Sequence, residues 1–259
     1  MTATRTTGAS LLVERNLMIY RHTWALLLAE ILEPLLYLAS IGVGIGVLVG
    51  HVHGLSGGVH VSYAAYVAPA LLATAAMNGA MNETTFLMFG RLTVDRVYQP
   101  ILTTPLTVRD IVLGEVAWAL LRGAGVATAF LAIIGALGLV HSPWALLAVP
   151  GAVLIGAAFA ATGVAVVTVI RSWPDFQYVQ LVMLPMFLFA TTFYPVGVYP
   201  RPVQVLVECL PLYQSIQLLR QPALGVVGPA LLGPACYLMA MTGIALVIAL
   251  RRMRRLLYV

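Results

Sequence analysis

The stretch RLTVDRVYQPILTTPLTVRDIVLGE, residues 91–115, separates two long apolar runs with charges and prolines. Charged residues make up only 9% of the chain, yet this stretch contains Arg91, Asp95, Arg96, Arg109, Asp110 and Glu115. Its first half has apolar residues at helical spacing, which would share one face: Val94, Val97, Tyr98 and Ile101. Pro100 kinks or ends that short helix. The stretch therefore predicts a short amphipathic helix that lies between two apolar segments.

Two capping signals mark helix starts near such turns. Thr107 and Asp110 have the spacing of a capping box, which predicts that a new helix begins near residue 108. Ser172 and Asp175 repeat this spacing in RSWPDF, residues 171–176, with Pro174 in the first turn. We expect a second tight turn there.

The composition places the chain in a membrane. Hydrophobic residues make up 61% of the 259 residues, and the mean hydropathy is +0.97. A soluble domain carries about a quarter charged residues, and a spanning helix needs about 20 apolar residues. Helices are expected because unpaired backbone groups are too costly in lipid. We predict an all-α integral membrane protein with one transmembrane domain, 1–259, and six membrane-spanning helices at 24–50, 63–89, 108–140, 144–170, 177–197 and 229–250.

The arginines orient these spans. If the N-terminus is cytoplasmic, only Arg201 and Arg220 face outward and Arg122 lies within a span, while the other arginines are all cytoplasmic. Such a bias follows the positive-inside rule and places both termini in the cytoplasm. The tail RRMRR, residues 251–255, anchors this topology and favours anionic membrane lipid. Because the positive charge follows the topology, we expect no nucleic-acid partner.

Two further segments are predicted to lie at the membrane surfaces. Val13, Leu17, Tyr20 and Trp24 form a moderate apolar stripe, which favours an interfacial helix over 8–23; a polar leader to the first span is the alternative. Prolines divide residues 195–222 into apolar pieces of about ten residues, too short to span. We predict a re-entrant hairpin at the outer face between spans five and six.

The chain lacks the residues of several enzyme classes. It contains no lysine, so it has no Walker A loop and no Schiff-base lysine. No pattern of a nucleophile triad or of paired catalytic carboxylates occurs, so we expect no catalytic residue. We expect no metal site either, because His51, His53 and His60 lack the spacing of four zinc ligands.

Ionisable residues within the spans are candidates for a substrate path or polar gate, because such residues are costly in a membrane. The candidates are Glu33, Glu83 and Arg122. We expect Arg122 to pair with an intramembrane glutamate, Glu30, Glu33, Glu83 or Glu115, with Glu33 as first choice from its depth. A purely structural ion pair is the alternative.

Two stretches resemble the ABC-2 type permeases, on the branch of nodulation-factor and daunorubicin-type exporters. The first is MNETTFLMFGRLTVDRVYQPILTTPLTVRDIVLGE, residues 81–115, with Phe89, Arg91, Tyr98, Ile101, Leu102, Thr104, Pro105, Leu106, Gly114 and Glu115 in the matching places. The second combines LPMFLFATTFYPVGVYP, 184–200, with LPLYQSIQLLR, 210–220, where Phe193, Pro195, Pro211, Leu212 and Arg220 match. Tyr213-Gln214 departs from the family, which often has an aromatic residue followed by histidine.

The resemblance implies a dimeric permease with the fold of a type V ABC exporter in the bacterial cytoplasmic membrane. ATP and Mg would bind a separate ATP-binding subunit, and this chain would carry no cofactor. A coupling helix, 91–104, and the 171–176 turn would contact that subunit through Arg91, Asp95, Arg96, Tyr98, Gln99, Trp173 and Asp175. Phe193, Pro195, Pro211 and Tyr213 would belong to the outer gate. The second permease would be another copy or a paralogue.

The function implied is ATP-driven export of an amphipathic substrate such as a glycolipid, a lipid-linked saccharide or a hydrophobic drug. An ion-gradient-driven secondary transporter is the alternative. Inverted repeats with helix breaks at matching points would favour that alternative, whereas only the second half of this chain has a broken segment. An intramembrane enzyme is a further alternative, but the sequence shows no set of catalytic residues for it.

Overall fold

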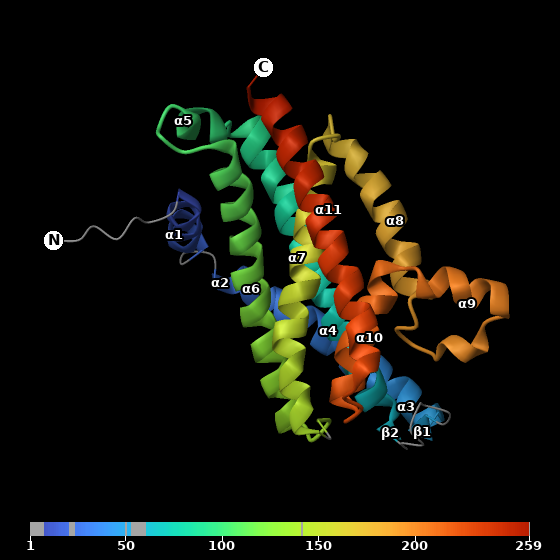
Figure 1. Cartoon of the computed structure of the whole chain (residues 1–259). Helices are drawn as coiled ribbons and strands as arrows, with labels where there is room; N and C mark the ends of the chain where they lie inside the picture. Colours follow the sequence, from blue (N-terminus) through green and yellow to red (C-terminus); the bar gives the residue numbers. More distant parts are fainter. Residues whose placement is uncertain (1–7, 21–23, 50, 53–60, 141, 259) are drawn as a thin grey trace.

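The computed structural model describes residues 8–20, 24–49, 51–52, 61–140 and 142–258, mostly as long helices packed side by side (Figure 1). The first part of the chain comprises α1 Gly8–Tyr20, α2 Trp24–Tyr37, η1 Leu38–Val43, α3 Gly44–Val49, β1 His51–Val52, β2 Val61–Ser62, α4 Tyr63–Asn82, η2 Glu83–Leu87, η3 Gly90–Val94 and α5 Tyr98–Leu102. The second part comprises α6 Val108–Ala136, η4 Pro143–Leu147, α7 Ala148–Val167, η5 Trp173–Asp175, α8 Phe176–Phe189, η6 Val196–Val198, α9 Arg201–Glu208, α10 Pro211–Ala223, η7 Pro229–Leu231 and α11 Leu232–Leu257. Strands β1 and β2 form a short antiparallel pair.

Five helical segments among the described residues are long and apolar enough to cross a membrane. They are Leu27–Gly46, Tyr63–Val94, Val108–Ala136, Pro143–Val167 and Pro229–Leu257. These segments coincide with predicted spans one to four and six, which confirms an all-helical multi-pass membrane architecture. The second segment continues beyond residue 89 to Val94, and the last continues beyond residue 250 to Leu257.

The fifth predicted span, 177–197, does not form one helix of spanning length. α8 has 14 residues, which is ~21 Å at 1.5 Å per residue. The helix ends at Phe189; Thr191 then takes a φ of 62°, and Pro195 disfavours helical backbone in the residue before it. Figure 1 shows α8 along the upper half of the bundle, α10 along the lower half, and α9 projecting sideways between them.

The 195–222 segment contains two short helices, α9 and α10, as its prolines suggest, but these differ in burial. Val205 and Leu206 of α9 are exposed. In contrast, Leu212, Ile216 and Leu219 of α10 are fully buried, because α10 packs against α4, α7 and α11. The second half of the segment is therefore part of the bundle core.

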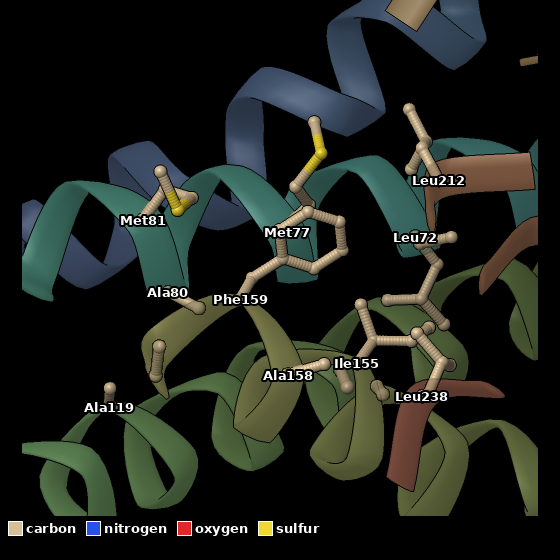
Figure 2. Close-up of a cluster of buried hydrophobic side chains, with 14 of the residues drawn as sticks. Leu72, Met77, Ala80, Met81, Ala119, Ile155, Ala158, Phe159, Leu212 and Leu238 are labelled. Atoms are coloured by element: carbon tan, nitrogen blue, oxygen red, sulfur yellow. The ribbon is translucent and has the colours of Figure 1, made fainter. Parts of the chain in front are cut away.

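Helix α7 is the centre of the bundle and packs against α4, α6, α10 and α11. Small residues make this contact close: at Gly163 an added Cβ would collide with Thr84, and at Gly151 with Leu219. Figure 2 shows the resulting core, in which Phe159 and Ile155 of α7 meet side chains of α4, α10 and α11. This core holds α4 and its π-helical continuation η2 in place.

Helix α1 forms within the predicted interfacial helix, 8–23, whose residues 21–23 lie outside the described part. It packs along α6, and its buried residues are Leu12, Asn16 and Tyr20. Of the predicted stripe, Tyr20 is buried against the protein and Val13 is half-buried, while Leu17 is 55% exposed. The two polar members of the buried stripe, Asn16 and Tyr20, are explained by their hydrogen bonds, described below.

The predicted coupling helix, 91–104, is not one helix. Residues 91–94 belong to η3, which continues the second span, and a separate five-residue helix, α5, follows. Arg96 takes a φ of 48° between them and turns the chain. We call residues 95–105 the α5 turn.

Both predicted capping boxes are confirmed. The Thr107 hydroxyl accepts from the Asp110 N–H at 3.3 Å, and the Asp110 carboxylate accepts from the Thr107 N–H at 2.9 Å, at the start of α6. The Asp175 carboxylate accepts from the backbone N–H groups of Arg171 and Ser172 at 2.9 and 3.1 Å. Figure 1 places α5, the start of α8 and the C-terminal end of α11 at the same end of the bundle.

Candidate functional site

The most polar part of the interior is centred on Arg91, which joins two buried glutamates. Its Nη2 donates to Glu83 Oε1 at 2.7 Å, and its Nη1 donates to Glu115 Oε2 at 2.6 Å. Glu83 and Glu115 are each 1% exposed. Glu83 begins η2 and Arg91 lies in η3, so both are on π-helical segments, which often occur at functional sites.

Arg122, on α6, extends this arrangement toward α2. Its Nη1 lies 2.9 Å from Glu83 Oε2 and 3.1 Å from Glu30 Oε1, and its Nη2 donates to the Gly79 carbonyl at 3.0 Å. The expectation that Arg122 pairs with an intramembrane glutamate is confirmed, but the choice of Glu33 was wrong. The partner on α2 is Glu30, three residues before Glu33, and the Glu33 side chain is exposed.

Arg15 on α1 pairs with Glu115, at the opposite end of this chain of ion pairs from Arg122. Its Nη2 lies 3.2 Å from Glu115 Oε1. Arg15, Glu115, Arg91, Glu83, Arg122 and Glu30 thus form a continuous row of alternating charge. We call these six residues the charge network. Its positive and negative charges balance, which offsets the cost of burying them.

Neutral side chains from two surface elements complete the charge network. Asn16 Nδ2 of α1 donates to Glu115 Oε2 at 3.2 Å, and the Tyr20 hydroxyl donates to Glu83 Oε2 at 3.0 Å. The Tyr98 hydroxyl of α5 donates to Glu115 Oε1 at 3.0 Å. Burial and, second, Glu83 raise the pKa of Tyr20 to about 12, and burial and then Glu115 raise the pKa of Tyr98 well above its usual value. Both hydroxyls therefore remain protonated donors at neutral pH.

A cleft begins where the charge network ends. A hollow of about 270 Å³ is lined by residues of α2, α4, α6 and α8, including Glu30, Glu33 and Arg122. A second hollow of about 360 Å³ shares Glu30, Glu33, Asn78 and Gln180 with the first. We call the two together the cleft. Asn78 is at the middle of the 32-residue helical segment Tyr63–Val94, so the cleft opens at mid-helix depth.

An aromatic cluster connects the second span to the start of α8. Phe86 and Phe89 contact Trp173 with ring centroids 4.8 and 5.0 Å apart, and they contact Phe176 at 5.3 and 5.4 Å. Such pairs contribute about 0.5–1.5 kcal/mol each beyond burial. The 171–176 turn is therefore attached to the same helix that carries Glu83 and Arg91.

The residues expected to contact an ATP-binding subunit divide into two groups. Asp95, Arg96 and Gln99 are exposed on the α5 turn. Trp173 is 45% exposed at the aromatic cluster, and Asp175 is half-buried and caps the 171–176 turn.

Arg91 and Tyr98 form the second group, because their side chains bind carboxylates inside the bundle. Tyr98 is 1% exposed, and Arg91 points inward to two carboxylates. The apolar face of α5, which includes Tyr98, packs against the bundle. In this position the Tyr98 hydroxyl can donate a hydrogen bond to the Glu115 carboxylate.

The residues expected at the outer gate surround the break after α8. The Phe193 ring packs on Phe187 with centroids 5.3 Å apart, and the Phe193 carbonyl accepts from the Tyr63 hydroxyl at 3.1 Å. Pro195 precedes η6, while Pro211 starts α10 and Tyr213 packs against its core. They lie on different elements around one break in the chain.

Arg220, which sequence reasoning placed at the outer face, is 4% exposed in the bundle. It donates to the Thr191 carbonyl at 2.9 Å and to the Tyr66 hydroxyl at 3.0 Å, and its guanidinium carbon lies 3.9 Å from the Tyr66 ring centre. No carboxylate pairs with it among the described residues. Arg220 thus fixes the end of α8 through neutral groups.

Sequence reasoning missed three members of the polar interior, Arg15, Asn16 and Tyr20. A usable signal existed, since Leu12, Asn16 and Tyr20 are spaced four apart on one helical face. Glu30 and Glu115 were recognised as intramembrane charges but not as members of a site. No group of three potential metal ligands occurs within the described ranges; His53 and His60 lie outside them.

Comparisons with known proteins agree with this architecture. The sequence model of the family "ABC-2 type transporter" matches residues 7–224. Nodulation protein J of Rhizobium leguminosarum bv. viciae is 37% identical over 202 residues, which cover 78% of this chain and 76% of the relative. The same protein of R. leguminosarum bv. trifolii is 38% identical over 78% of this chain and 75% of the relative. Nodulation protein J of Rhizobium meliloti is 35% identical over the same shares, 78% and 75%. The chain belongs to the ABC-2 type transporter family.

Proposed function

We propose that this chain is the membrane subunit of an ATP-driven exporter that moves an amphipathic substrate across the bacterial cytoplasmic membrane. Family membership supports a transport role. The observation that carries the proposal is the charge network, which runs from the α5 turn through Tyr98 and Glu115 to Glu30 and Arg122 at the cleft. A surface that could receive force is thereby connected to a space that could hold substrate.

A separate ATP-binding subunit would dock on the exposed residues of the α5 turn, Asp95, Arg96 and Gln99, and on Trp173 of the 171–176 turn. ATP and Mg would bind that subunit, because this chain has no lysine for a P-loop. Nucleotide can change the permease only by favouring one of its states in the docked complex. Movement of α5 would shift Tyr98, and the carboxylates and guanidinium groups of the charge network would exchange partners.

The docking end would be cytoplasmic under the positive-inside rule. Figure 1 places α5, the start of α8 and the end of α11 at that end, and Arg96 precedes α5, Arg171 precedes η5 and α8, and the C-terminal arginines are in the last turns of α11. Both termini would then be cytoplasmic. The chain would cross the membrane six times, with α8 and α10 sharing the fifth crossing, and α9 would lie between them. Phe193, Pro195, Pro211 and Tyr213 would form the outer gate around the break. A second copy or a paralogue would complete the permease, surrounded by membrane lipid.

Copurification tests the docking surface. The chain is expressed together with its candidate ATP-binding subunit, and Arg96→Glu is compared with Arg201→Glu, an exposed charge reversal on α9. We expect Arg96→Glu to reduce copurified ATP-binding protein about tenfold, the effect of ~1.4 kcal/mol. Arg201→Glu should leave it unchanged. Equal recovery with both variants would remove the α5 turn as the docking surface.

The secondary-transporter alternative draws on Glu30 and Glu33, two carboxylates at the cleft that could bind a coupling ion. Substrate uptake by proteoliposomes that contain this chain alone, driven by an imposed ion gradient, would support it. We expect no such uptake without the ATP-binding subunit and ATP.

A further inference from the structure

Glu33 is the carboxylate of the cleft that the charge network does not neutralise. The six residues of the network balance one another, and no ion pair among the described residues includes Glu33. Its side chain is exposed and lines both hollows of the cleft. A carboxylate at membrane depth is costly unless a positive charge approaches it. Glu33 is therefore the group of the cleft beside which a cation would be stabilised.

Among the described residues that line the cleft, Arg122 carries the one guanidinium, which already has partners. Arg122 contacts Glu30, Glu83, the Tyr20 hydroxyl and the Gly79 carbonyl. An anionic head group would have to displace these contacts and would meet Glu33 as well. Charge complementarity thus favours a positive ligand over a negative one.

The rest of the cleft is suited to an apolar body. Leu71 and Leu72 of α4 and Val126 of α6 line one side, and Phe187 of α8 lies 6.5 Å from Tyr37 of α2 between ring centroids. Apolar walls with a few polar groups are typical of small-molecule sites, and aromatic faces attract cations. The exposed amides of Asn78 and Gln180 lie at the same rim as Glu33.

We propose that the cleft binds amphipathic cations, with the positive group beside Glu33 and the apolar part against α4, α6 and the rings of Tyr37 and Phe187. This inference rests on the proposed transport function and names the substrate class of the same site. Glu33 sets the charge preference, and the apolar walls supply most of the contact area.

Binding of two probes of the same shape and opposite charge tests this inference. The purified chain, without any ATP-binding subunit, is placed in lipid nanodiscs and titrated with radiolabelled tetraphenylphosphonium or tetraphenylborate, with empty nanodiscs subtracted. We expect saturable binding of the phosphonium and none of the borate. Glu33→Gln should raise the Kd of the phosphonium about tenfold, or ~1.4 kcal/mol, and Glu33→Asp should retain most of the affinity.

Glu208→Gln is the matched control, because Glu208 is an exposed carboxylate on α9 outside the cleft. It should leave the Kd unchanged, and the thermal stability of Glu33→Gln should equal that of the unchanged chain. Absence of phosphonium binding, equal binding of borate, or an unchanged Kd in Glu33→Gln would overturn the inference. These outcomes are independent of the copurification experiment, so a wrong substrate class and a wrong transport function would be distinguished.

Discussion

Two sites of this protein bury arginine side chains, and they offset the cost of burying the positive charge in different ways. Arg91 and Arg122 lie in a balanced series of carboxylates. Arg220 is bound instead by the ring, hydroxyl and backbone carbonyl of Tyr66 on α4 and by the Thr191 carbonyl just after α8. In the first site the charges hold several helices together. In the second site the irregular backbone after α8 supplies the Thr191 carbonyl as one of the acceptors, so the arginine stabilises the helix break.

The largest expected effect is that of Glu83→Gln, because Glu83 is shared by Arg91 and Arg122. Removing one member of a buried charge pair costs about 3–5 kcal/mol. We expect a strong loss of folded, monodisperse protein and a lower midpoint in thermal unfolding in detergent. Glu14→Gln on the exposed face of α1 is the matched control and should be neutral. Unchanged stability in Glu83→Gln would mean that the series is not electrostatically connected.

Arg220→Met should have a smaller effect than Glu83→Gln. It removes a buried charge that has no carboxylate partner in the described part, and it leaves the Thr191 carbonyl, which lies outside a helix, without this donor. Unsatisfied buried groups cost about 1–3 kcal/mol each, offset in part by relief of burying the charge. Because the loss is local, we expect protease cleavage to increase first in the 190–200 segment. A global loss as large as that of Glu83→Gln would erase the contrast between the two sites.

The smallest effect concerns Asp175, which caps the 171–176 turn outside both arginine sites. Its hydrogen bonds from the Arg171 and Ser172 N–H groups hold the pKa of this carboxyl below its usual value. A lowered pKa means that the stabilisation is complete above the unfolded pKa of about 3.9 and is lost as the pH falls through the folded pKa. Asp175→Asn should therefore speed amide exchange at 171–176 near neutral pH. The difference from the unchanged chain should shrink below about pH 4; a pH-independent difference would contradict this.

The sequence was sufficient for the elements that depend on local patterns. Apolar length located five helical segments, and the Thr107–Asp110 and Ser172–Asp175 spacings located two helix starts. The orientation of the polar side chains depended on tertiary packing. Tyr98 was expected to contact an ATP-binding subunit, but its hydroxyl points inward and donates to Glu115. Asn16, which was not singled out from the sequence, donates to the same carboxylate.

The fifth span was misjudged because apolar composition does not reveal where backbone leaves the helix. Thr191 adopts a positive φ, and Arg220, distant in sequence, accounts for that turn. Glu30 and Glu33 are both on α2 within one turn of each other, so their different partners could not be separated from periodicity alone.

A double-mutant cycle between Tyr98 and Glu30 tests most directly whether the charge network connects the α5 turn to the cleft. The two residues share no direct partner, since Tyr98 binds Glu115 and Glu30 binds Arg122. Substrate-stimulated ATP hydrolysis is measured for the complex carrying Tyr98→Phe, Glu30→Gln, or both. The account predicts that the double variant loses less than the sum of the single losses, with a coupling of about 0.5–3 kcal/mol. Strictly additive losses would show two independent sites and would contradict it.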